Sequence, residues 1–213
     1  MIVRTLTVGP FQENCYLLAD GDTREAVLVD PGDEGARLIA AVEHEGFTLR
    51  AIWITHAHVD HIGGIAEVKR RFDVPVCLHP LDRPLYDLVV EIGRKYGLQV
   101  EAPPPPDHEL ADGDVLTVGR LSFDVLHVPG HAPGHVAFVG HGAAFGGDCL
   151  FAGSVGRTDL PMSDPRALER SLQRLAALPP ETVVYCGHGP ATTVGDETRS
   201  NPFLTGVARL KTS

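Results

Sequence analysis

Three histidines and an aspartate lie within six positions, directly after a run of apolar residues. Residues 51–54 read Ala-Ile-Trp-Ile, and the chain continues Thr-His-Ala-His-Val-Asp-His-Ile-Gly-Gly to residue 64. A continuous apolar run of this length is typical of a strand that is covered on both faces. The segment therefore predicts a buried strand with an H-x-H-x-D-H motif at its carboxyl end, where loops carry function.

The side chains of this motif are metal ligands by type. Neutral imidazole and carboxylate bind zinc and the neighbouring first-row metal ions. In an extended segment His56 and His58 project to the same side, whereas Asp60 and His61 would lie in the turn into the next helix. Four adjacent ligands do not converge easily on one tetrahedral ion, so the motif favours a pair of metal ions.

Further residues of this kind follow later apolar segments. His131 and His135 lie in Pro-Gly-His-Ala-Pro-Gly-His at 129–135, a segment that its prolines restrict. Asp148 follows two glycines, and His188 lies in Cys-Gly-His-Gly at 186–189. A single histidine after a strand would more often be structural. The repeated order of strand, glycine and ligand instead predicts one convergent site.

The rest of the chain predicts mixed strands and helices in both halves. We expect strands at residues 2–8, 15–19, 26–29, 51–54, 74–78, 115–118, 121–128, 136–139, 143–146 and 182–185. We expect helices at 33–45, 65–72, 81–96 and 165–177, the last capped by Asp164 with Pro165 as its first residue. Four prolines at 103–106 are extended and close an excursion within one domain, 1–213. The pattern indicates an α/β chain with two facing sheets and helices outside, although periodicity alone does not separate this from a three-layer fold.

Charge and composition exclude several classes of function. Lys and Arg number 18 against 28 Asp and Glu, for a formal net charge of -10, and no basic cluster is present, so we expect no nucleic-acid partner. No apolar run is long enough to span a bilayer and no signal peptide is evident, so we expect no membrane partner and a cytoplasmic location. The four cysteines are widely spaced, which predicts buried free thiols.

These motifs resemble the metallo-β-lactamase superfamily, and within it the glyoxalase II-like hydrolases, also called hydroxyacylglutathione hydrolases. The resemblance rests on the H-x-H-x-D-H motif, on Pro-Gly-His at 129–131, on Gly-Asp at 147–148 and on Cys-Gly-His-Gly at 186–189, and covers essentially the whole chain. It implies a four-layer αβ/βα sandwich of two facing mixed sheets, with a dinuclear metal site at one edge. It further implies two sets of ligands joined by a bridge: His56, His58 and His131 on the first ion, Asp60, His61 and His188 on the second, and Asp148 on both.

Two divalent ions that share a water would lower its pKa from about 15.7 towards neutrality. The resulting hydroxide, held between the metals bound by Asp60 and Asp148, would attack an activated acyl carbon. The resemblance narrows the substrate to a small-molecule thioester, such as S-D-lactoylglutathione. Zn²⁺ is the expected metal, and the same ligands accept iron or manganese. We expect His135 to support a ligand by hydrogen bonding.

Some segments are similar to the short, single-domain bacterial branch of these hydrolases. These are residues 151–159 and Asn-Pro-Phe-Leu at 201–204. Full-length glyoxalase II carries a C-terminal helical domain with basic residues for the glutathione carboxylates, and we expect this chain to lack it. The Lys-x-Tyr contacts of the family fall at Arg157 and Asp159, which we take as candidate substrate contacts. Arg157 keeps the positive charge, whereas Asp159 does not replace a tyrosine, so recognition of glutathione stays open.

Other functions stay open beside the thioesterase. The segment 156–159 is similar to persulfide dioxygenases, which share the fold and use one Fe(II) ion, here matched by His56, His131 and Asp148. A lactonase or another ester hydrolase would use the same metal pair. A non-catalytic metal-binding protein is disfavoured, because seven ligands on two ions leave coordination positions for water. The oligomeric state is not determined by the sequence.

Overall fold

The computed structural model describes residues 1–210, in which two six-stranded sheets face each other. The first sheet holds, in this order, β1 (Ile2–Val8), β2 (Glu13–Ala19), β3 (Glu25–Val29), β4 (Thr48–Trp53), β5 (Val76–Leu78) and β6 (His108–Glu109). The second holds β7 (Val115–Val118), β8 (Leu121–His127), β9 (Val136–Gly140), β10 (Ala143–Gly147), β13 (Val183–Cys186) and β14 (Thr192–Thr193), in the order β14-β13-β10-β9-β8-β7. Both sheets mix parallel and antiparallel pairs.

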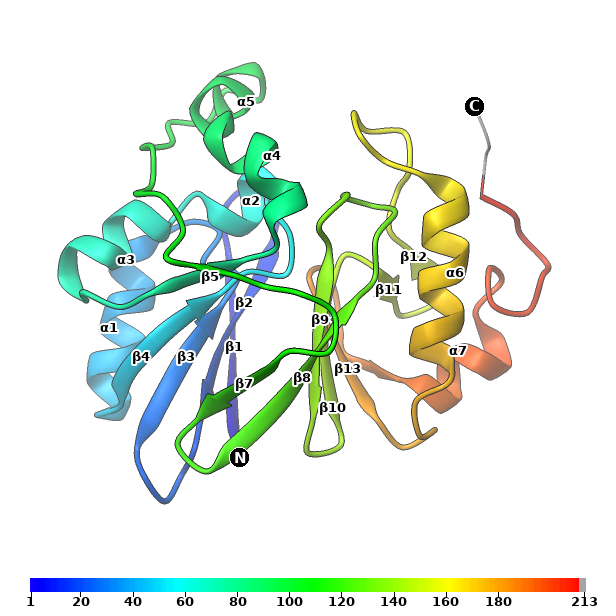
Figure 1. Cartoon of the computed structure of the whole chain (residues 1–213), viewed down its shortest axis with the longest axis horizontal. Coiled ribbons are helices and arrows are strands. Elements are labelled where there is room, and N and C mark those ends of the chain that lie inside the picture. Colours follow the sequence, from blue (N-terminus) through cyan, green and yellow to red (C-terminus); the bar gives the residue numbers. More distant parts are fainter. Residues whose placement is uncertain (211–213) are drawn as a thin grey trace.

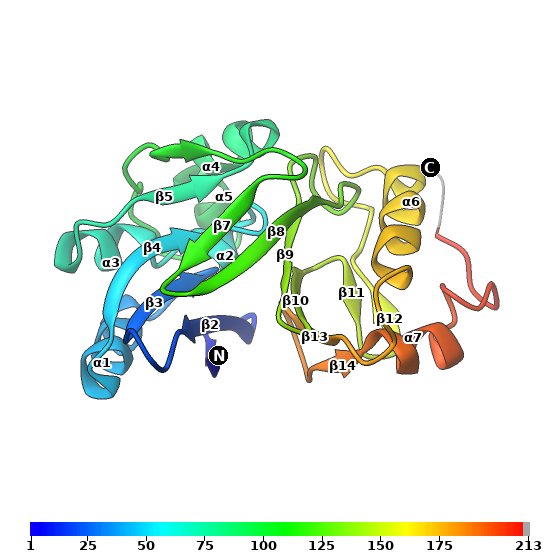
Figure 2. The ribbon, with the colours of Figure 1, turned by 60° about the horizontal axis from the view of Figure 1, so that its bottom comes forward.

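Helices cover the outer face of each sheet. On the first lie α1 (Gly35–Glu45), α2 (Val59–Ile62), α3 (Ile65–Arg71), the 3₁₀ turn η1 (Pro80–Asp82), α4 (Arg83–Asp87) and α5 (Val89–Lys95); on the second lie α6 (Pro165–Ala176) and α7 (Val194–Ser200). Figure 1 and Figure 2 both place α1 and α3 on one side of the molecule and α6 and α7 on the other. The order helix, sheet, sheet, helix confirms the predicted four-layer sandwich.

Alternation along the central strands creates the layers. In β2, Leu17 packs outward against the helices, whereas Leu18 packs inward against the second sheet. In β4, Ile52 faces the helices and Trp53 the second sheet, where its ring lies 5.7 Å from Phe123 and 5.3 Å from Phe138, measured between centroids. The apolar run at 51–54 is thus covered on both faces, as predicted.

The expected helix at 81–96 is wrong as a continuous element. Its residues form η1, α4 and α5, and Leu88 interrupts the helix at φ -94°, ψ 6°. Pro84 occupies the first turn of α4, the part of a helix that tolerates proline because its N–H groups have no helical partner. Tyr86 Oη donates a hydrogen bond to Pro104 O at 2.8 Å, which holds the proline segment against α4.

Helix α7 is absent from the sequence-based prediction. Residues 194–200 read Val-Gly-Asp-Glu-Thr-Arg-Ser and lack the apolar spacing of an amphipathic helix. Thr193 caps α7 by accepting from Asp196 N, and the buried carboxylate of Glu197 accepts hydrogen bonds from Thr192 Oγ1 and Gly153 N. Tertiary contacts therefore stabilise a helix that the local pattern does not specify.

The expected cap of α6 and the expected state of the cysteines are confirmed. Asp164 caps α6 by accepting from Arg166 N and Ala167 N, with Pro165 in the first turn. The four cysteines are buried and free. Between residues 1 and 210 the structure contains no helix with the length and apolarity needed to cross a membrane.

Candidate metal centre

The seven candidate ligands come together at one edge of the sandwich. His56 and His58 follow β4, and Asp60 and His61 lie in the short helix α2. The others lie in loops that leave three mutually parallel strands of the second sheet: His131 after β8, Asp148 after β10 and His188 after β13. Because parallel strands end at the same edge of a sheet, three sequence segments far apart in the chain deliver their side chains to one place.

The first group consists of His56, His58 and His131. One side-chain nitrogen from each lies within 4.8 Å of the others. Nδ1 of His58 and Nε2 of His131 are 2.9 Å apart. Nε2 of His56 is buried and has no hydrogen-bond partner among the described residues. Three nitrogens therefore surround a small volume.

The second group consists of Asp60, His61 and His188, whose ligand atoms also lie within 4.8 Å of one another. Oδ2 of Asp60 is 3.2 Å from Nε2 of His188. His188 is the more exposed member, and its Nδ1 donates to Phe11 O at 3.1 Å. The second group thus offers one carboxylate and two imidazoles.

Asp148 lies between the two groups. Its Oδ1 is 3.4 Å from His61 Nε2, and its Oδ2 is 3.5 Å from Nε2 of both His131 and His188. A Cβ atom at Gly187 would lie 2.1 Å from Asp148 Oδ1, so a residue with a side chain at 187 would displace this carboxylate. Asp148 therefore lies close to members of both groups.

Burial and mutual charge shift the pKa values in this cluster. Burial lowers the pKa of His56 well below its usual value and keeps its imidazole neutral. Burial alone would raise the pKa of Asp148, but His61, His131 and His188 together lower it, so Asp148 is ionised at neutral pH. Burial opposes protonation of His61, yet Asp148 and Asp30 raise its pKa well above 6.5.

The residues fit a pair of divalent cations. Nε2 of His56, Nε2 of His61 and Oδ1 of Asp148 are buried without a hydrogen-bond partner in the described part of the chain. A buried polar atom left unpaired costs roughly 1–3 kcal/mol. These three atoms belong to the two groups and to the residue between them, and their chemistry is that of nitrogen and oxygen ligands.

Asp30 is a site residue that the sequence-based prediction missed. Its Oδ2 accepts from His61 Nδ1 at 3.0 Å, and Oδ1 accepts from Thr55 N at 2.7 Å. Although Asp30 also lies within 4.8 Å of His56 and His61 ligand atoms, these hydrogen bonds occupy its oxygens, so it orients a ligand. Its sequence signal was visible: like Asp148, it is a carboxylate directly after an apolar strand.

Glu13 is a second missed residue, and it had no sequence signal. It is buried in β2, its Oε1 lies 3.8 Å from His61 Nδ1, and neither carboxylate oxygen has a hydrogen-bond partner among residues 1–210. Burial raises its pKa well above the usual value. Glu13 lies before the expected strand at 15–19, and only the packing of β2 against α2 brings it to the site.

His135 and the Arg157–Asp159 pair occupy different parts of the site. His135 is fully buried with its ring centroid 4.6 Å from that of His56, but the described residues provide no hydrogen bond to its nitrogens. Its supporting role stays a prediction. Arg157 is exposed and binds Asp159 through Nε and Nη2, at 2.6 and 2.8 Å. The Arg157 backbone oxygen accepts from His131 Nδ1 at 2.8 Å, which places this pair beside the first group.

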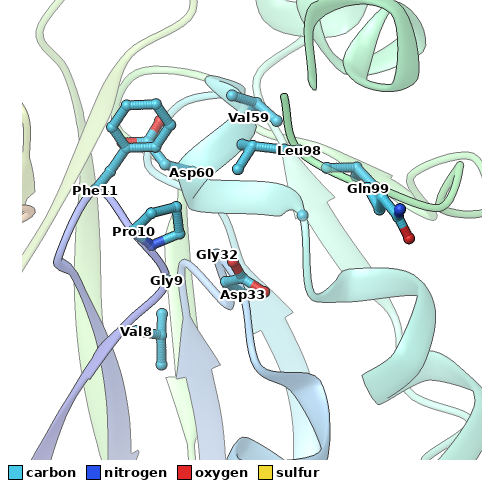
Figure 3. A pocket seen from close by; sticks show the side chains of 12 residues that line it. Val8, Gly9, Pro10, Phe11, Gly32, Asp33, Val59, Asp60, Leu98 and Gln99 are labelled. Atoms are coloured by element: carbon cyan, nitrogen blue, oxygen red, sulfur yellow. The ribbon is translucent and has the colours of Figure 1, made fainter. Parts of the chain in front are cut away.

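A pocket of about 50 Å³ opens beside Asp60 (Figure 3). The turn between β1 and β2 forms one wall, including Phe11, and Leu98 and Gln99 form another. Phe11 is 41% exposed and its ring lies edge-on to that of Tyr96, itself 53% exposed, with centroids 5.7 Å apart. An exposed aromatic pair thus stands next to the cluster.

A stacked pair of histidines supports the His131 loop from the other side. The rings of His79 and His127 lie 4.3 Å apart with an interplanar angle of 6°. His127 Nε2 donates to Pro133 O at 3.0 Å. His79 is buried, and this burial, together with His127, lowers its pKa to about 4.

The stack makes a prediction about acid stability. Below pH 6.5 an unfolded chain protonates His79, whereas the folded chain does not until about pH 4, so folding loses stability as the pH falls through this window. We expect the metal-free protein to lose about 2 kcal/mol more between pH 7.5 and 4.5 than a His79→Phe variant, which keeps a stacking ring without a titrating group. Urea unfolding at both pH values measures this difference. Equal losses in the two proteins would contradict it.

Comparison with known proteins places the chain in a family context. The family model described as the metallo-beta-lactamase superfamily matches residues 8–188. Hydroxyacylglutathione hydrolase GloC of Haemophilus influenzae is 37% identical over 209 residues, which are 96% of this chain and 98% of that protein. The structure of TTHA1623 in a di-iron-bound form is 50% identical with a TM-score of 0.89, covering 95% of this chain and 100% of the other. BLEG-1, a B3 metallo-beta-lactamase, is 40% identical with a TM-score of 0.90, covering 96% and 100%.

Proposed function

Because the chain belongs to the metallo-β-lactamase superfamily, we propose that it is a dinuclear metal-dependent hydrolase that cleaves a small-molecule thioester such as S-D-lactoylglutathione. The observation that carries the proposal is the position of Asp148, within 3.5 Å of ligand atoms from both groups. A mononuclear centre would not need a second complete set of ligands joined to the first through one carboxylate.

Each ligand has a place in this proposal. His56, His58 and His131 would hold one ion, Asp60, His61 and His188 the other, and Asp148 both. The relative known as TTHA1623 has been crystallised with two iron ions, which supports a pair. We expect zinc here, and iron or manganese would suit the same nitrogen and oxygen donors. When bound, two divalent ions supply a hydroxide nucleophile at neutral pH and stabilise negative charge on a carbonyl oxygen.

The chain itself sets the imidazole tautomers. Three of the histidines have Nδ1 next to an acceptor: Asp30 Oδ2 for His61, Arg157 O for His131 and Phe11 O for His188. Each Nδ1–H then donates a hydrogen bond, and Nε2 keeps its lone pair towards the centre. Such partners fix the ring orientation and raise the basicity of the ligand. The residues around the site thus prepare these nitrogens as ligands.

Phe11, Tyr96 and Arg157 stand where a substrate would approach. The two exposed rings offer apolar surface beside Asp60, suited to the uncharged part of an acyl thioester. Asp159 already occupies two donors of Arg157, so a substrate carboxylate would bind there only by displacing Asp159 or by using the remaining Nη1. We propose that Arg157 and Asp159 are substrate contacts, and that a substrate carboxylate can take the place of Asp159 on Arg157. The GloC relative is named for a hydroxyacylglutathione substrate, which favours a thioester.

Metal analysis beside parallel substrate assays tests the proposal. We expect about two divalent ions per chain and hydrolysis of S-D-lactoylglutathione, because the two ligand groups are joined. A lactoyl thioester of N-acetylcysteamine is the matched control, since it keeps the bond and lacks the glutathione carboxylates. Turnover of both with similar KM would indicate that glutathione is not recognised.

Other outcomes would move the assignment to another activity. One iron per chain, with oxygen uptake on glutathione persulfide, would replace the hydrolase by a dioxygenase that uses His56, His131 and Asp148. Hydrolysis of lactones or β-lactams without thioester cleavage would be consistent with the proposed metal pair but would contradict the proposed thioester substrate. Two bound ions with no turnover of any acyl compound would overturn the hydrolase itself.

A further inference from the structure

A buried carboxylate outside the two ligand groups joins the loops that carry the first one. Asp82, at the end of η1, has an exposed fraction of 0%. Its Oδ2 accepts a hydrogen bond from Ala57 N at 2.8 Å, and its Oδ1 accepts one from Gly134 N. The two donors are separated by 77 positions along the chain, and the single side chain of Asp82 links them.

Both donors lie between histidines of the site. Ala57 separates His56 from His58, and Gly134 lies between His131 and His135. A shift of either backbone N–H moves the imidazoles on both sides of it. His58 Nδ1 and His131 Nε2 lie 2.9 Å apart. The Asp82 carboxylate therefore provides a second connection between the two loops that carry these histidines.

Within residues 1–210, no lysine or arginine forms an ion pair with Asp82, and burial raises the pKa of its carboxyl to about 6. A buried carboxyl is costly to folding unless hydrogen bonds satisfy it. Here each carboxylate oxygen accepts one backbone N–H, so hydrogen bonds compensate the burial of Asp82 at a position that connects the two ligand loops.

The surrounding structure holds Asp82 and the second loop in register. Asp82 N donates to His79 O at 3.0 Å, and His79 stacks on His127, which binds Pro133 O. A Cβ atom at Gly134 would lie 2.7 Å from Asp82 N, so only glycine allows the loop to approach this closely. The segment from His79 to Asp82 thus contacts the loop directly at Gly134 and, through His127, at Pro133.

We propose that Asp82 is a positioning residue that sets the distance between the two histidine loops and thereby the geometry of the first metal-binding group. This inference rests on the proposed metal centre. Asp82 itself would not touch the ion or the substrate, and it acts through the backbone of Ala57 and Gly134. Orienting partners of this kind are typically worth 10- to 100-fold in metal affinity.

Asp82→Asn tests the inference, because asparagine keeps the size and offers only one oxygen for the two N–H donors. Co²⁺ serves as the probe, with affinities from competition against a chelator and geometry from the visible absorption spectrum. We expect one of the two Co²⁺ ions to bind 10- to 100-fold more weakly with an altered spectrum, and the other to bind within about twofold of wild type.

Asp20→Asn is the matched control. Asp20 is also a buried carboxylate, 4% exposed, that accepts backbone N–H groups, from Asp22 and from Arg120 on another segment. It lies just beyond the far end of β2, roughly 20 Å from the cluster by strand length. This variant loses the same kind of hydrogen bond. Because the loss occurs far from the cluster, the variant should keep both Co²⁺ affinities and the wild-type spectrum.

A second variant covers the case in which Asp82→Asn does not fold. His127→Phe keeps the stack on His79 and removes the hydrogen bond to Pro133 O, and it should weaken the same Co²⁺ ion by a smaller factor. Wild-type affinities and spectra in the folded variants would overturn the role of Asp82 while leaving the metal centre standing. A wild-type protein that binds no Co²⁺ pair would overturn the metal centre and this inference together.

Discussion

Replacing Asp148 with alanine should remove most of the hydrolytic activity while the fold is retained. Asp148 contacts His61, His131 and His188 within 3.5 Å, so its loss separates the two ligand groups. We expect kcat/KM on S-D-lactoylglutathione to fall at least about 100-fold, because the loss of an outer partner of a ligand already costs 10- to 100-fold. Metal content should drop below two ions per chain, because the carboxylate shared by both groups is gone.

The fold should survive because Asp148 lies in the loop after β10, outside the apolar clusters that hold the two sheets and their helices together. Circular dichroism and urea unfolding of the metal-free variant measure this. Asp124→Ala is the control, because Asp124 is an exposed carboxylate on β8 away from both groups. An Asp148→Ala protein with two bound ions and full turnover would contradict the bridging role.

Removing the metal ions with a chelator should abolish activity and lower the melting temperature by roughly 10 °C. Ligands that bind only the folded state stabilise it by about 4 kcal/mol when present at 1,000 times their dissociation constant, and a chain of this size loses about 2–4 °C per kcal/mol. The buried atoms His56 Nε2, His61 Nε2 and Asp148 Oδ1 have no other partner within residues 1–210 to replace the ion. Calorimetry before and after chelation measures the shift.

Readdition of Zn²⁺, Mn²⁺ or Fe²⁺ to separate portions of the chelated protein identifies the ions that restore turnover. Asp148→Ala protein should show a smaller shift on chelation than wild type, because it binds fewer ions. If the chelated enzyme keeps its activity and its melting temperature, the proposed metal-dependent hydrolysis is wrong. Recovery by one metal alone would identify the functional ion.

The residues of the two ligand groups could be predicted because their signals are local. His56, His58, Asp60 and His61 form one short motif behind an apolar strand, and His131, Asp148 and His188 each follow a strand with glycine nearby. The alternating apolar pattern likewise predicted most strands, since side chains on successive residues of a strand face opposite layers. Resemblance to a known family then supplied the way in which the two sheets and the ligands assemble.

Among the supporting residues, Asp30 follows an apolar strand and so carries a local signal, but Asp82 and Glu13 could not be predicted in this way. Asp82 contacts Gly134 across 52 positions, and Glu13 approaches His61 from another strand. A buried carboxylate of this kind looks like any surface aspartate or glutamate in the sequence, because its hydrogen-bond partners are backbone and side-chain groups of distant segments.

The sequence by itself determined which side chains are candidate metal ligands and which strands present them, because ligand type and strand alternation are properties of neighbouring residues. The tertiary structure decided how those side chains are oriented, through Asp30, Asp82 and the carbonyl oxygens of Phe11 and Arg157. It also decided that residues 81–96 break into three short helices and that residues 194–200 form one. These outcomes depend on hydrogen bonds and packing between segments that meet only after folding. Local helix propensity does not predict such contacts.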